Sequence, residues 1–297
     1  MQKLLILGGT NFIGRHFIEK IADREDLDIT LFNRQKTNTH LFPNINKIKG
    51  DRETNEISSI LNYNWDIIVD FSSYFPNSLE YLIHQLKGKV KRYIYISTVS
   101  VYDFKQNHSS IDENSILNIC EEEDKTNNSN ATYGKRKVAC EDVLKKATWL
   151  DSIILRPSVI YGPYDYTERL YYWMYRIADE KPFLLPSNGQ QKMTFTYVED
   201  LTNTLIKALE INSHRKIYNV TSQQSDTFYK LLQHINPTIK AVSISREEIN
   251  RIDKLRDQIF PICFPIDLDV DSSKLVKDFK IEFVPWDKAI KETEQYY

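Results

Sequence analysis

The stretch that decides the fold is Leu4-Leu5-Ile6-Leu7-Gly8-Gly9-Thr10-Asn11-Phe12-Ile13-Gly14, near the start of the chain. Four apolar residues, typical of a buried strand, pass through a glycine turn into the helical spacing of Phe12–Ala22. Such a turn presents free backbone N–H groups and the positive end of the helix dipole, which together favour a phosphate. The chain has only 8 glycines and three lie here. We therefore interpret the turn as a pyrophosphate site rather than as a tight connection without a ligand.

The first half of the chain continues this alternation of strand and helix. Apolar residues at spacings of three and four predict helices, and short apolar runs predict strands. The expected helices are Phe12–Ala22, Ser78–Lys87 and Tyr133–Ala147, and the expected strands are Lys3–Leu7, Asp28–Phe32, Lys47–Lys49, Asp66–Asp70, Tyr93–Ile96 and Ser152–Leu155. This pattern predicts an α/β fold with a doubly wound parallel sheet of the Rossmann type.

The second half departs from this rhythm and predicts a smaller lobe. The polar segment Asn107–Asn130 is long for a loop, so we expect it to be mobile or functional, such as a loop over an active site. Aromatic and proline residues cluster from Pro157 to Pro186, and helical spacing returns at Val198–Ile211. We expect a dinucleotide-binding domain over residues 1–155, rejoined at about 194–220, and a discontinuous α/β substrate lobe from 156–193 and 221–297.

Composition limits the classes of partner. The 39 Lys and Arg residues against 41 Asp and Glu give a charge of −2, so we expect no basic field for nucleic acid or an anionic membrane, and a small molecule as partner. We expect no signal peptide, because apolar residues begin at Leu4, and no segment long enough to span a bilayer. Cys120, Cys140 and Cys263 are widely separated, which favours reduced thiols in a cytoplasm. The six scattered histidines give a metal site little support.

The end of the second expected strand bears on the choice of cofactor. An acidic residue there normally takes the ribose hydroxyls of NAD, and this chain has Asn33 and Arg34 instead. No carboxylate repels a 2′-phosphate, and Arg34, with Arg15 as a second candidate, offers a cation to pair with it. The sequence therefore favours NADP(H) over NAD(H). Asn11 stands where dinucleotide-binding turns have their middle glycine, and we expect it to tolerate a left-handed backbone.

Tyr133 and Lys137 are the expected proton-transfer pair. They open an expected helix, and the spacing of four puts them on one face. A free phenol has a pKa of about 10, which a neighbouring ammonium lowers. Thr98 follows the strand Tyr93–Ile96, at the carboxyl edge where open α/β sheets bind ligands. We expect Thr98 to hydrogen-bond the substrate oxygen while Tyr133 transfers its proton and a nicotinamide exchanges hydride with the same carbon.

Together these motifs resemble those of the extended short-chain dehydrogenase/reductases, the NAD-dependent epimerase/dehydratase family. The resemblance covers nearly the full length and depends on the order of the motifs as much as on any one of them. Besides the glycine turn they are Ser97-Thr98-Val99-Ser100-Val101-Tyr102, Tyr133-Gly134-Lys135-Arg136-Lys137 with Glu141, Leu155-Arg156-Pro157 through Tyr161-Gly162-Pro163, and Tyr197-Val198-Glu199-Asp200-Leu201.

The resemblance implies an NAD(P)-dependent oxidoreductase, epimerase or dehydratase that acts on a secondary alcohol or carbonyl of a sugar-like or nucleotide-sugar substrate. It implies Thr98 as the hydroxyl residue, Tyr133 as the acid/base, and Lys137 as a ligand of the nicotinamide ribose. It also implies a homodimer built from the helices near Ser78–Lys87 and Tyr133–Ala147. The implied cofactor contacts are Gly8, Thr10, Asn11, Phe12, Ile13, Gly14, Asn33, Arg34, Asp51, Phe71, Ser72, Tyr133, Lys137 and Pro157.

Two positions depart from the nucleotide-sugar pattern. Val159 stands where many nucleotide-sugar epimerases have an Asn, and Met193 stands where they have an Arg. Both changes remove groups that would meet the phosphates of a substrate. The candidate replacements are Lys192, Arg169 and Arg176, each of which is alternatively an ordinary surface charge.

Two functions of other classes stay open at this stage. The glycine turn also resembles that of atypical members such as the chloroplast stem-loop-binding proteins, which associate with RNA. The Lys135-Arg136-Lys137 cluster and the tyrosine-rich Tyr164–Tyr175 stretch keep this alternative open, although the near-neutral charge opposes it and we favour a lobe core for the aromatic stretch. The other is a catalytically silent NAD(P)-binding sensor, against which the presence of Thr98, Tyr133 and Lys137 counts.

Overall fold

The main feature of the computed structural model is a seven-stranded parallel sheet, with strand order β11-β6-β5-β4-β1-β2-β3. The structure describes residues 1–107, 110–212, 214–221, 225–252, 260–262 and 266–297. The strands of the sheet are β1 (Gln2–Leu7), β2 (Leu27–Asn33), β3 (Asn46–Lys49), β4 (Trp65–Asp70), β5 (Val90–Ile96), β6 (Asp151–Pro157) and β11 (Lys216–Val220). The predicted Rossmann-type sheet is therefore confirmed, and each predicted strand lies within an observed one.

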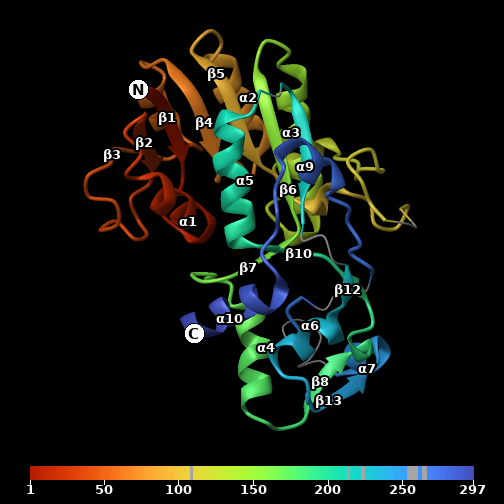
Figure 1. Ribbon diagram of the computed structural model, residues 1–297. Helices are drawn as coiled ribbons and strands as arrows, with labels where there is room; N and C mark the ends of the chain where they lie inside the picture. Colours follow the sequence, from red (N-terminus) through yellow and green to blue (C-terminus); the bar gives the residue numbers. More distant parts are fainter. Residues whose placement is uncertain (108–109, 213, 222–224, 253–259, 263–265) are drawn as a thin grey trace.

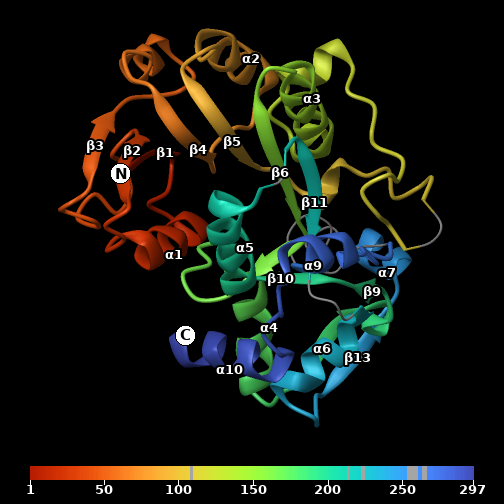
Figure 2. The ribbon, with the colours of Figure 1, turned by 45° about the horizontal axis from the view of Figure 1, so that its top comes forward.

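Helices cover both faces of this sheet (Figures 1 and 2). On one face, α1 (Phe12–Ile21) packs against α5 (Val198–Glu210), and α9 (Ser273–Phe279) packs beside β11. On the other face, α2 (Pro76–Gln85) packs against α3 (Tyr133–Lys146). The four predicted helices are confirmed to within two residues at each end.

The continuous apolar run of β1 follows from this sandwich of helices. Successive side chains of a strand point to opposite faces. Leu4 and Ile6 join the core on the α1 side, whereas Leu5 and Leu7 join the core on the α2 side. All four side chains are at most 1% exposed, as expected of a parallel sheet that is covered on both faces.

A smaller lobe lies below the sheet in Figure 1 and has its own aromatic core. Its helices are α4 (Arg169–Ala178), α6 (Phe228–Ile235), α7 (Arg246–Arg251) and α10 (Trp286–Tyr296). Its strands form pairs: β7 (Val159–Tyr161) with β10 (Phe195–Tyr197), β8 (Phe183–Pro186) with β13 (Ala241–Ile244), and β9 (Lys192–Met193) with β12 (Asp226–Thr227). Short 3₁₀ turns are η1 (Asn55–Ile60), η2 (Val99–Val101), η3 (Glu122–Lys125), η4 (Asn130–Thr132) and η5 (Ser187–Gly189). The exact domain boundaries stay a prediction.

The aromatic stretch of the lobe divides between core and surface. Trp173 is fully buried and packs against Phe183 and Phe228, whereas Tyr166 and Tyr175 are more than half exposed. The stretch therefore contributes to the lobe core, as we favoured, through only some of its residues.

Two searches of the described residues bear on other classes of protein. None of the described helices is both long and apolar enough to cross a membrane. The described side chains include no group of three or more His, Cys, Asp or Glu placed to hold a metal ion. Cys120 and Cys140 are free thiols, and Cys263 lies outside the described residues.

Candidate active site

The glycine turn forms a cradle at the carboxyl end of β1. Gly8 and Gly9 both have positive φ angles, 92° and 91°, which few other residues tolerate. A Cβ on Gly14 would lie 2.4 Å from the Cα of Gly9, so α1 approaches the turn as closely as two backbones allow. Asn11 makes no side-chain cap and the first turn of α1 holds no acidic residue. The first N–H groups of α1 therefore remain available to a phosphate.

The conformation of this turn corrects one expectation. Asn11 is not left-handed: its φ and ψ are −126° and 148°, in the extended region. The positive φ falls instead on Phe12, at 33°. Asn11 is held by its side-chain oxygen, which accepts from Asn38, while Asn38 also donates to the carbonyl of Thr10. The loop after β2 therefore fixes the turn through hydrogen bonds.

A pocket of about 510 Å³ opens above this turn, a volume typical of small-molecule and cofactor sites. It gathers side chains from the carboxyl ends of β1 to β5 and from the start of α3. The predicted cofactor residues that line it are Gly8, Thr10, Asn11, Phe12, Ile13, Gly14, Asn33, Arg34, Asp51, Phe71, Ser72, Tyr133 and Lys137. Pro157 does not line it and lies instead in the neighbouring pocket. We call this space the cofactor pocket.

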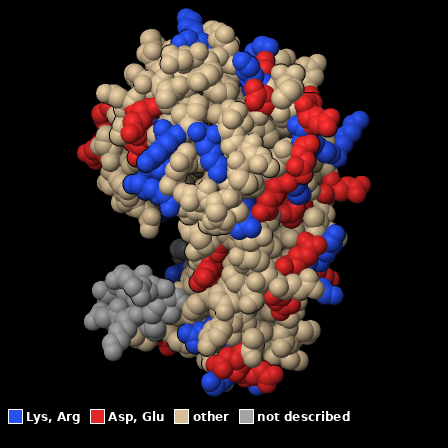
Figure 3. Space-filling view, turned by 90° about the vertical axis from the view of Figure 1, so that its left-hand side faces the viewer, with Lys and Arg blue, Asp and Glu red and all other residues tan. Residues whose placement is uncertain are grey.

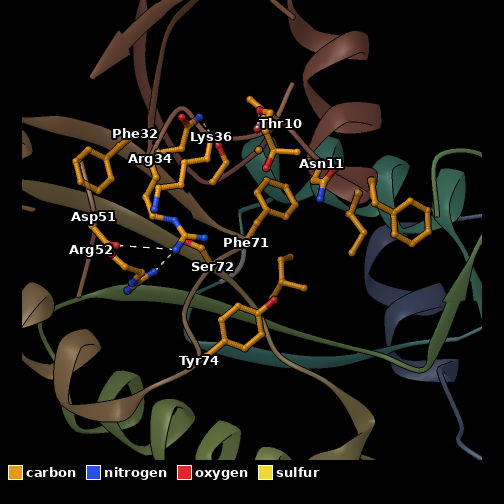
Figure 4. Close-up of a pocket in the computed structure, with 18 of the residues that line it drawn as sticks. Thr10, Asn11, Phe32, Arg34, Lys36, Asp51, Arg52, Phe71, Ser72 and Tyr74 are labelled. Atoms are coloured by element: carbon orange, nitrogen blue, oxygen red, sulfur yellow. Dashed lines mark hydrogen bonds and ion pairs between the residues drawn. The ribbon is translucent and has the colours of Figure 1, made fainter. Parts of the chain in front are cut away.

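Cations gather at the end of the cofactor pocket beside β2 and β3. Figure 4 shows Arg34 and Arg52 converging beside Asp51 and Ser72, with Lys36 close by. Nη1 of Arg34 lies 4.0 Å from Oδ2 of Asp51, and the Arg34 side chain is 61% exposed. On the side of the molecule where β2 and β3 lie, Lys and Arg side chains surround a hollow (Figure 3). Lys36 and Arg52 also line this pocket, although neither was predicted from the sequence.

Two residues at this end have different roles from those expected. The Asn33 side chain donates to the carbonyl of Gly8 and accepts from the N–H of Gln35, so it supports the turn. Arg15 does not line the cofactor pocket: it donates to Glu19 and its guanidinium lies 3.6 Å from the ring centre of Tyr164. Arg15 lies one turn into α1, which carries its side chain away from the pocket, so its candidacy for a 2′-phosphate was wrong.

Arg52 reaches the floor of the pocket through a buried ion pair. Its side chain is 7% exposed and donates to both carboxylate oxygens of Asp70 and to the hydroxyl of Ser72. Burial alone would raise the pKa of Asp70, but the Arg52 guanidinium outweighs it and holds the pKa below its usual range. The Nε and Nη2 atoms of Arg52 are buried without a hydrogen-bond partner. Arg52 follows Gly50-Asp51 after β3, and that position is the signal that would have identified it.

Tyr133 lies at the start of α3, beside the turn that follows β5. A Cβ on Gly134 would lie 2.0 Å from the carbonyl oxygen of Ser100, so only glycine lets α3 come this close to η2. Thr98 caps η2 through its hydroxyl, which accepts from the N–H of Ser100. Burial raises the pKa of Tyr133, while a hydrogen bond with Thr98 acts to lower it. The structure therefore brings Thr98 and Tyr133 together.

Lys137 was expected to lower the pKa of Tyr133, but in the structure its ammonium group binds backbone carbonyls. Its Nζ donates to the carbonyls of Ser73 and Ile96 at 3.0 and 2.6 Å and lies 4.2 Å from the ring centre of Tyr95. Burial lowers the pKa of Lys137 to about 8. The pKa of Tyr133 is raised, not lowered, because burial outweighs the neighbouring charges. That part of the prediction was wrong for this structure.

A second pocket, of about 1130 Å³, adjoins the first on the lobe side. We call it the substrate pocket. Thr98, Tyr133 and Pro157 line it together with lobe residues, and Asn118, Asn128 and Asn130 come from the Asn-rich segment. That segment therefore forms part of a pocket wall, as a functional loop would; residues 108–109 lie outside the described residues. Tyr133 lines both pockets.

The positions that depart from the nucleotide-sugar pattern are apolar in the structure as well. Val159 lines the substrate pocket and is 7% exposed, and Met193 is 1% exposed. Of the three candidate replacements only Arg169 lines this pocket. Lys192 lies 3.6 Å from Asp269, and Arg176 lies over the ring of Tyr172.

A buried charged network includes Ser97, which lines both pockets. Arg156, whose side chain is 1% exposed, donates through two nitrogens to Glu141, and the hydroxyl of Ser97 donates to the same carboxylate. Arg156 also donates to the hydroxyl of Tyr102, which donates to Asn219. The bidentate pairing compensates both charges where water is excluded.

The Lys135-Arg136-Lys137 cluster does not form a basic surface. Lys135 is paired with Asp124, whereas Arg136 and Lys137 are each 3% exposed. An RNA backbone requires accessible cations, so the structure removes this argument for RNA binding.

Comparisons with known proteins agree with this geometry. The model of the NAD dependent epimerase/dehydratase family matches residues 4–221, which include the glycine turn, Tyr133 and Lys137. The chain belongs to this family. The family assignment places the Rossmann sheet and the cofactor pocket among NAD-dependent epimerases and dehydratases and confirms the resemblance read from the sequence.

Individual relatives are distant. The chain is 28% identical over 245 residues to the chloroplast stem-loop binding protein of 41 kDa b of Arabidopsis thaliana, covering 76% of this chain and 60% of that protein. It is 23% identical over 254 residues to the dTDP-D-glucose 4,6-dehydratase of Dictyostelium discoideum, covering 74% of this chain and 58% of that protein. The chain thus matches less than two thirds of the length of these two relatives.

The fold is shared with solved structures over nearly the whole chain. The UDP-glucuronic acid 4-epimerase of Bacillus cereus, in complex with UDP-glucuronic acid and NAD, superposes with a TM-score of 0.77 at 16% identity, covering 99% of this chain and 98% of that one. At this identity the likeness shows the fold alone.

Proposed function

We propose that the protein is an NADP(H)-dependent enzyme that transfers hydride to or from a secondary alcohol or carbonyl of a sugar-like substrate. One observation carries this proposal: the Tyr133 side chain lines the cofactor pocket and the substrate pocket at once. A proton donor at that junction reaches the oxygen of the carbon that exchanges hydride. Family membership supplies the class of cofactor.

The proposed roles follow from the protonation states of the site. Because burial raises the pKa of Tyr133, the phenol keeps its proton near neutrality and is suited to give it to a carbonyl oxygen. Thr98 hydrogen-bonds the same oxygen. Two of the three N–H bonds of Lys137 go to backbone carbonyls, and we assign the third to the nicotinamide ribose. The cofactor supplies hydride; in an epimerase or dehydratase the hydride is returned, so no net redox change appears.

The preference for NADP(H) is supported by the charges beside β2. Arg34, Lys36 and Arg52 line the cofactor pocket there against Asp51 and Glu53. Of these, Arg34 is exposed and lies at the limit of an ion pair with Asp51, so it can turn to a 2′-phosphate at little cost. The solved structure named above carries NAD, which makes this preference a property to test in this chain.

A nucleotide-sugar substrate is supported by the relatives, one of which is a dTDP-D-glucose 4,6-dehydratase. A homodimer through α2 and α3 stays a prediction from the family resemblance. The cytoplasm as compartment stays a prediction from the separated cysteines.

Replacing Tyr133 by Phe tests the proposal. The change removes only the phenolic oxygen, so turnover is expected to fall by about 10²-fold or more while NADPH affinity changes little. Nicotinamide absorbance during incubation of NADP⁺-loaded protein with UDP-glucose, UDP-glucuronic acid and dTDP-glucose gives one readout, and product analysis gives the other. Tyr63→Phe, at a half-exposed tyrosine outside both pockets, is the matched control. Full turnover by Tyr133→Phe would eliminate the mechanism.

A further inference from the structure

Arg136 is a buried cation of the substrate pocket that the proposed chemistry does not use. It lies on α3 between Tyr133 and Lys137, is 3% exposed, and lines the substrate pocket. Its spacing of three from Tyr133 places both side chains on the same face of the helix. Its charge is therefore close to the reacting group.

The partners of Arg136 are neutral. Nη1 donates to the side-chain oxygen of Asn128 at 3.0 Å, and Nη2 donates to the carbonyl of Ser129 at 3.4 Å. The guanidinium lies 4.8 Å from the ring centre of Phe75. Its Nε is buried without a hydrogen-bond partner. Within the described ranges, no carboxylate lies within ion-pair distance of Arg136.

A buried guanidinium without a counter-charge is costly, since dipoles and an aromatic face replace only part of its hydration. Nearby buried arginines do not carry this cost: Arg52 is paired with Asp70, and Arg156 with Glu141. An anionic ligand would give Arg136 the counter-charge that Asp70 and Glu141 give the other two arginines.

The other described residues that line the substrate pocket do not provide that anion. Asp165 accepts from the backbone and hydroxyl of Thr167, and Asp103 accepts from Gln106 and from the N–H of Lys105. Arg169 lines the same pocket, is exposed, and makes no side-chain hydrogen bond or ion pair with the described residues. The charges of Arg136 and Arg169 both act on Tyr133, where they lower its pKa against the larger effect of burial.

We propose that the substrate carries an anionic group, a carboxylate or a phosphate, close to its reacting carbon, and that Arg136 together with Arg169 binds it. The planar fork of a guanidinium matches either group with two hydrogen bonds. This inference rests on the proposed function only in locating the reacting carbon beside Tyr133. It accounts for a chain that has Val159 and Met193 at the positions of the usual diphosphate partners and a cation beside Tyr133 in the substrate pocket instead.

Paired sugars that differ in one anionic group test the inference. Calorimetric titration of the NADPH-loaded protein compares UDP-glucose with UDP-glucuronic acid, for a carboxylate, and glucose with glucose 6-phosphate, for a phosphate. At least one anionic member is expected to bind about tenfold more tightly than its neutral partner. The pair that shows the preference identifies the group.

Substitutions assign the preference to residues. Arg136→Gln, which keeps a donor for Asn128, is expected to reduce the preference to about twofold or less while the neutral sugar binds as before. Arg169→Gln changes an exposed residue and is expected to reduce the preference for the anionic sugar about threefold. Lys146→Gln, an exposed lysine on the last turn of α3, removes the same charge and is expected to keep the full preference.

Equal binding of the neutral and anionic members in both pairs, or no binding of either anionic sugar, would overturn the inference. So would a full preference in a folded Arg136→Gln protein. Failure of the proposed function has a separate signature, the absence of NADPH binding by the wild-type chain. In that case the same sugar titrations without cofactor still decide whether Arg136 selects an anion.

Discussion

The cofactor pocket and the substrate pocket share Tyr133 but treat buried charge differently. At the cofactor pocket, Arg52 is paired with Asp70, and in the buried network that includes Ser97, Arg156 is paired with Glu141. In the substrate pocket, the described partners of Arg136 are neutral oxygens and an aromatic ring. The difference teaches that this fold provides a carboxylate for each of these arginines that it uses to hold its own strands together. A buried arginine without one indicates a ligand.

Two neighbouring carboxylates on α5 show the same contrast for negative charges, because one of them has cationic partners and the other does not. Burial acts to raise the pKa of Glu199, but hydrogen bonds from His16 and Lys20 outweigh it and lower the pKa to about 2. Asp200 accepts from the backbone N–H of Val284 and has no cation paired with it among the described residues, and burial raises its pKa to about 7. The presence of a counter-charge, not the depth of burial, therefore decides whether the pKa of a buried carboxylate is lowered or raised.

The largest effect expected from this contrast is on stability. Glu141→Gln leaves the Arg156 guanidinium uncompensated, which is expected to lower the free energy of unfolding by about 3–5 kcal/mol. Arg136→Gln removes a charge that has no counter-charge among the described residues, and it is expected to change the free energy of unfolding by less than about 1 kcal/mol. Denaturant titration measures both, with Asp142→Asn, a half-exposed neighbour of Glu141, as control. Equal losses for Glu141→Gln and Arg136→Gln would break the comparison.

A pH dependence is expected next from Asp200. Because its folded pKa is raised, the native state keeps a proton that the unfolded chain has lost, so the associated stability is present at low pH and is lost as pH rises through about 7. Between about pH 5 and pH 7 this one group is expected to lower the free energy of unfolding by roughly 2 kcal/mol. Asp200→Asn, whose amide oxygen still accepts from Val284, is expected to lack this decrease. Stability curves that run parallel across this range would contradict the assignment.

Substitution of Gly14 or Gly134 by alanine is expected to affect the two pockets separately. Gly14→Ala pushes α1 from the Gly9 backbone and is expected to weaken NADPH binding at least about tenfold. Gly134→Ala pushes α3 from Ser100 and is expected to lower turnover while NADPH affinity is largely kept. Fluorescence titration measures the NADPH affinity of each variant, and an activity assay measures its turnover. A Gly14→Ala protein with unchanged affinity would mean that the turn does not hold the pyrophosphate.

The smallest effect is expected at the exposed end of the cofactor pocket. Arg34→Gln removes a cation that is largely in solvent, so the dissociation constant for NADPH is expected to rise about fivefold, close to 1 kcal/mol. The constant for NADH is expected to stay unchanged, because it has no 2′-phosphate. An equal change for both cofactors would remove the NADP(H) preference.

The first half of the fold could be predicted from the sequence because its signals are local. The run Leu4–Leu7 is long enough to be buried on both faces. The four predicted helices that cover the sheet repeat their apolar positions over 10 to 14 residues. The lobe gave no such signal. Strands of two residues such as β9 and β12 pair only because the surrounding aromatic core brings them together, and no periodicity exists over that length.

Within the site, sequence reasoning identified residues but not the directions of their side chains. It placed Thr98, Tyr133 and Lys137 correctly at the sheet edge. It could not show that Lys137 donates to Ser73 and Ile96, since the first carbonyl lies in the loop after β4 and the second at the end of β5. Arg136 was read as part of a surface cluster, because burial of a cation depends on loops that pack over it. Spacing determines which residues share a face, and tertiary packing determines their partners.

A crystal structure of the protein with bound NADPH tests the central claim most directly. The account predicts the pyrophosphate on the N–H groups of Gly8 to Gly14 and the nicotinamide at the junction of the two pockets, with the Tyr133 hydroxyl and Lys137 within hydrogen-bond reach of its ribose. A nicotinamide bound elsewhere, or Tyr133 turned away from the junction, would contradict it.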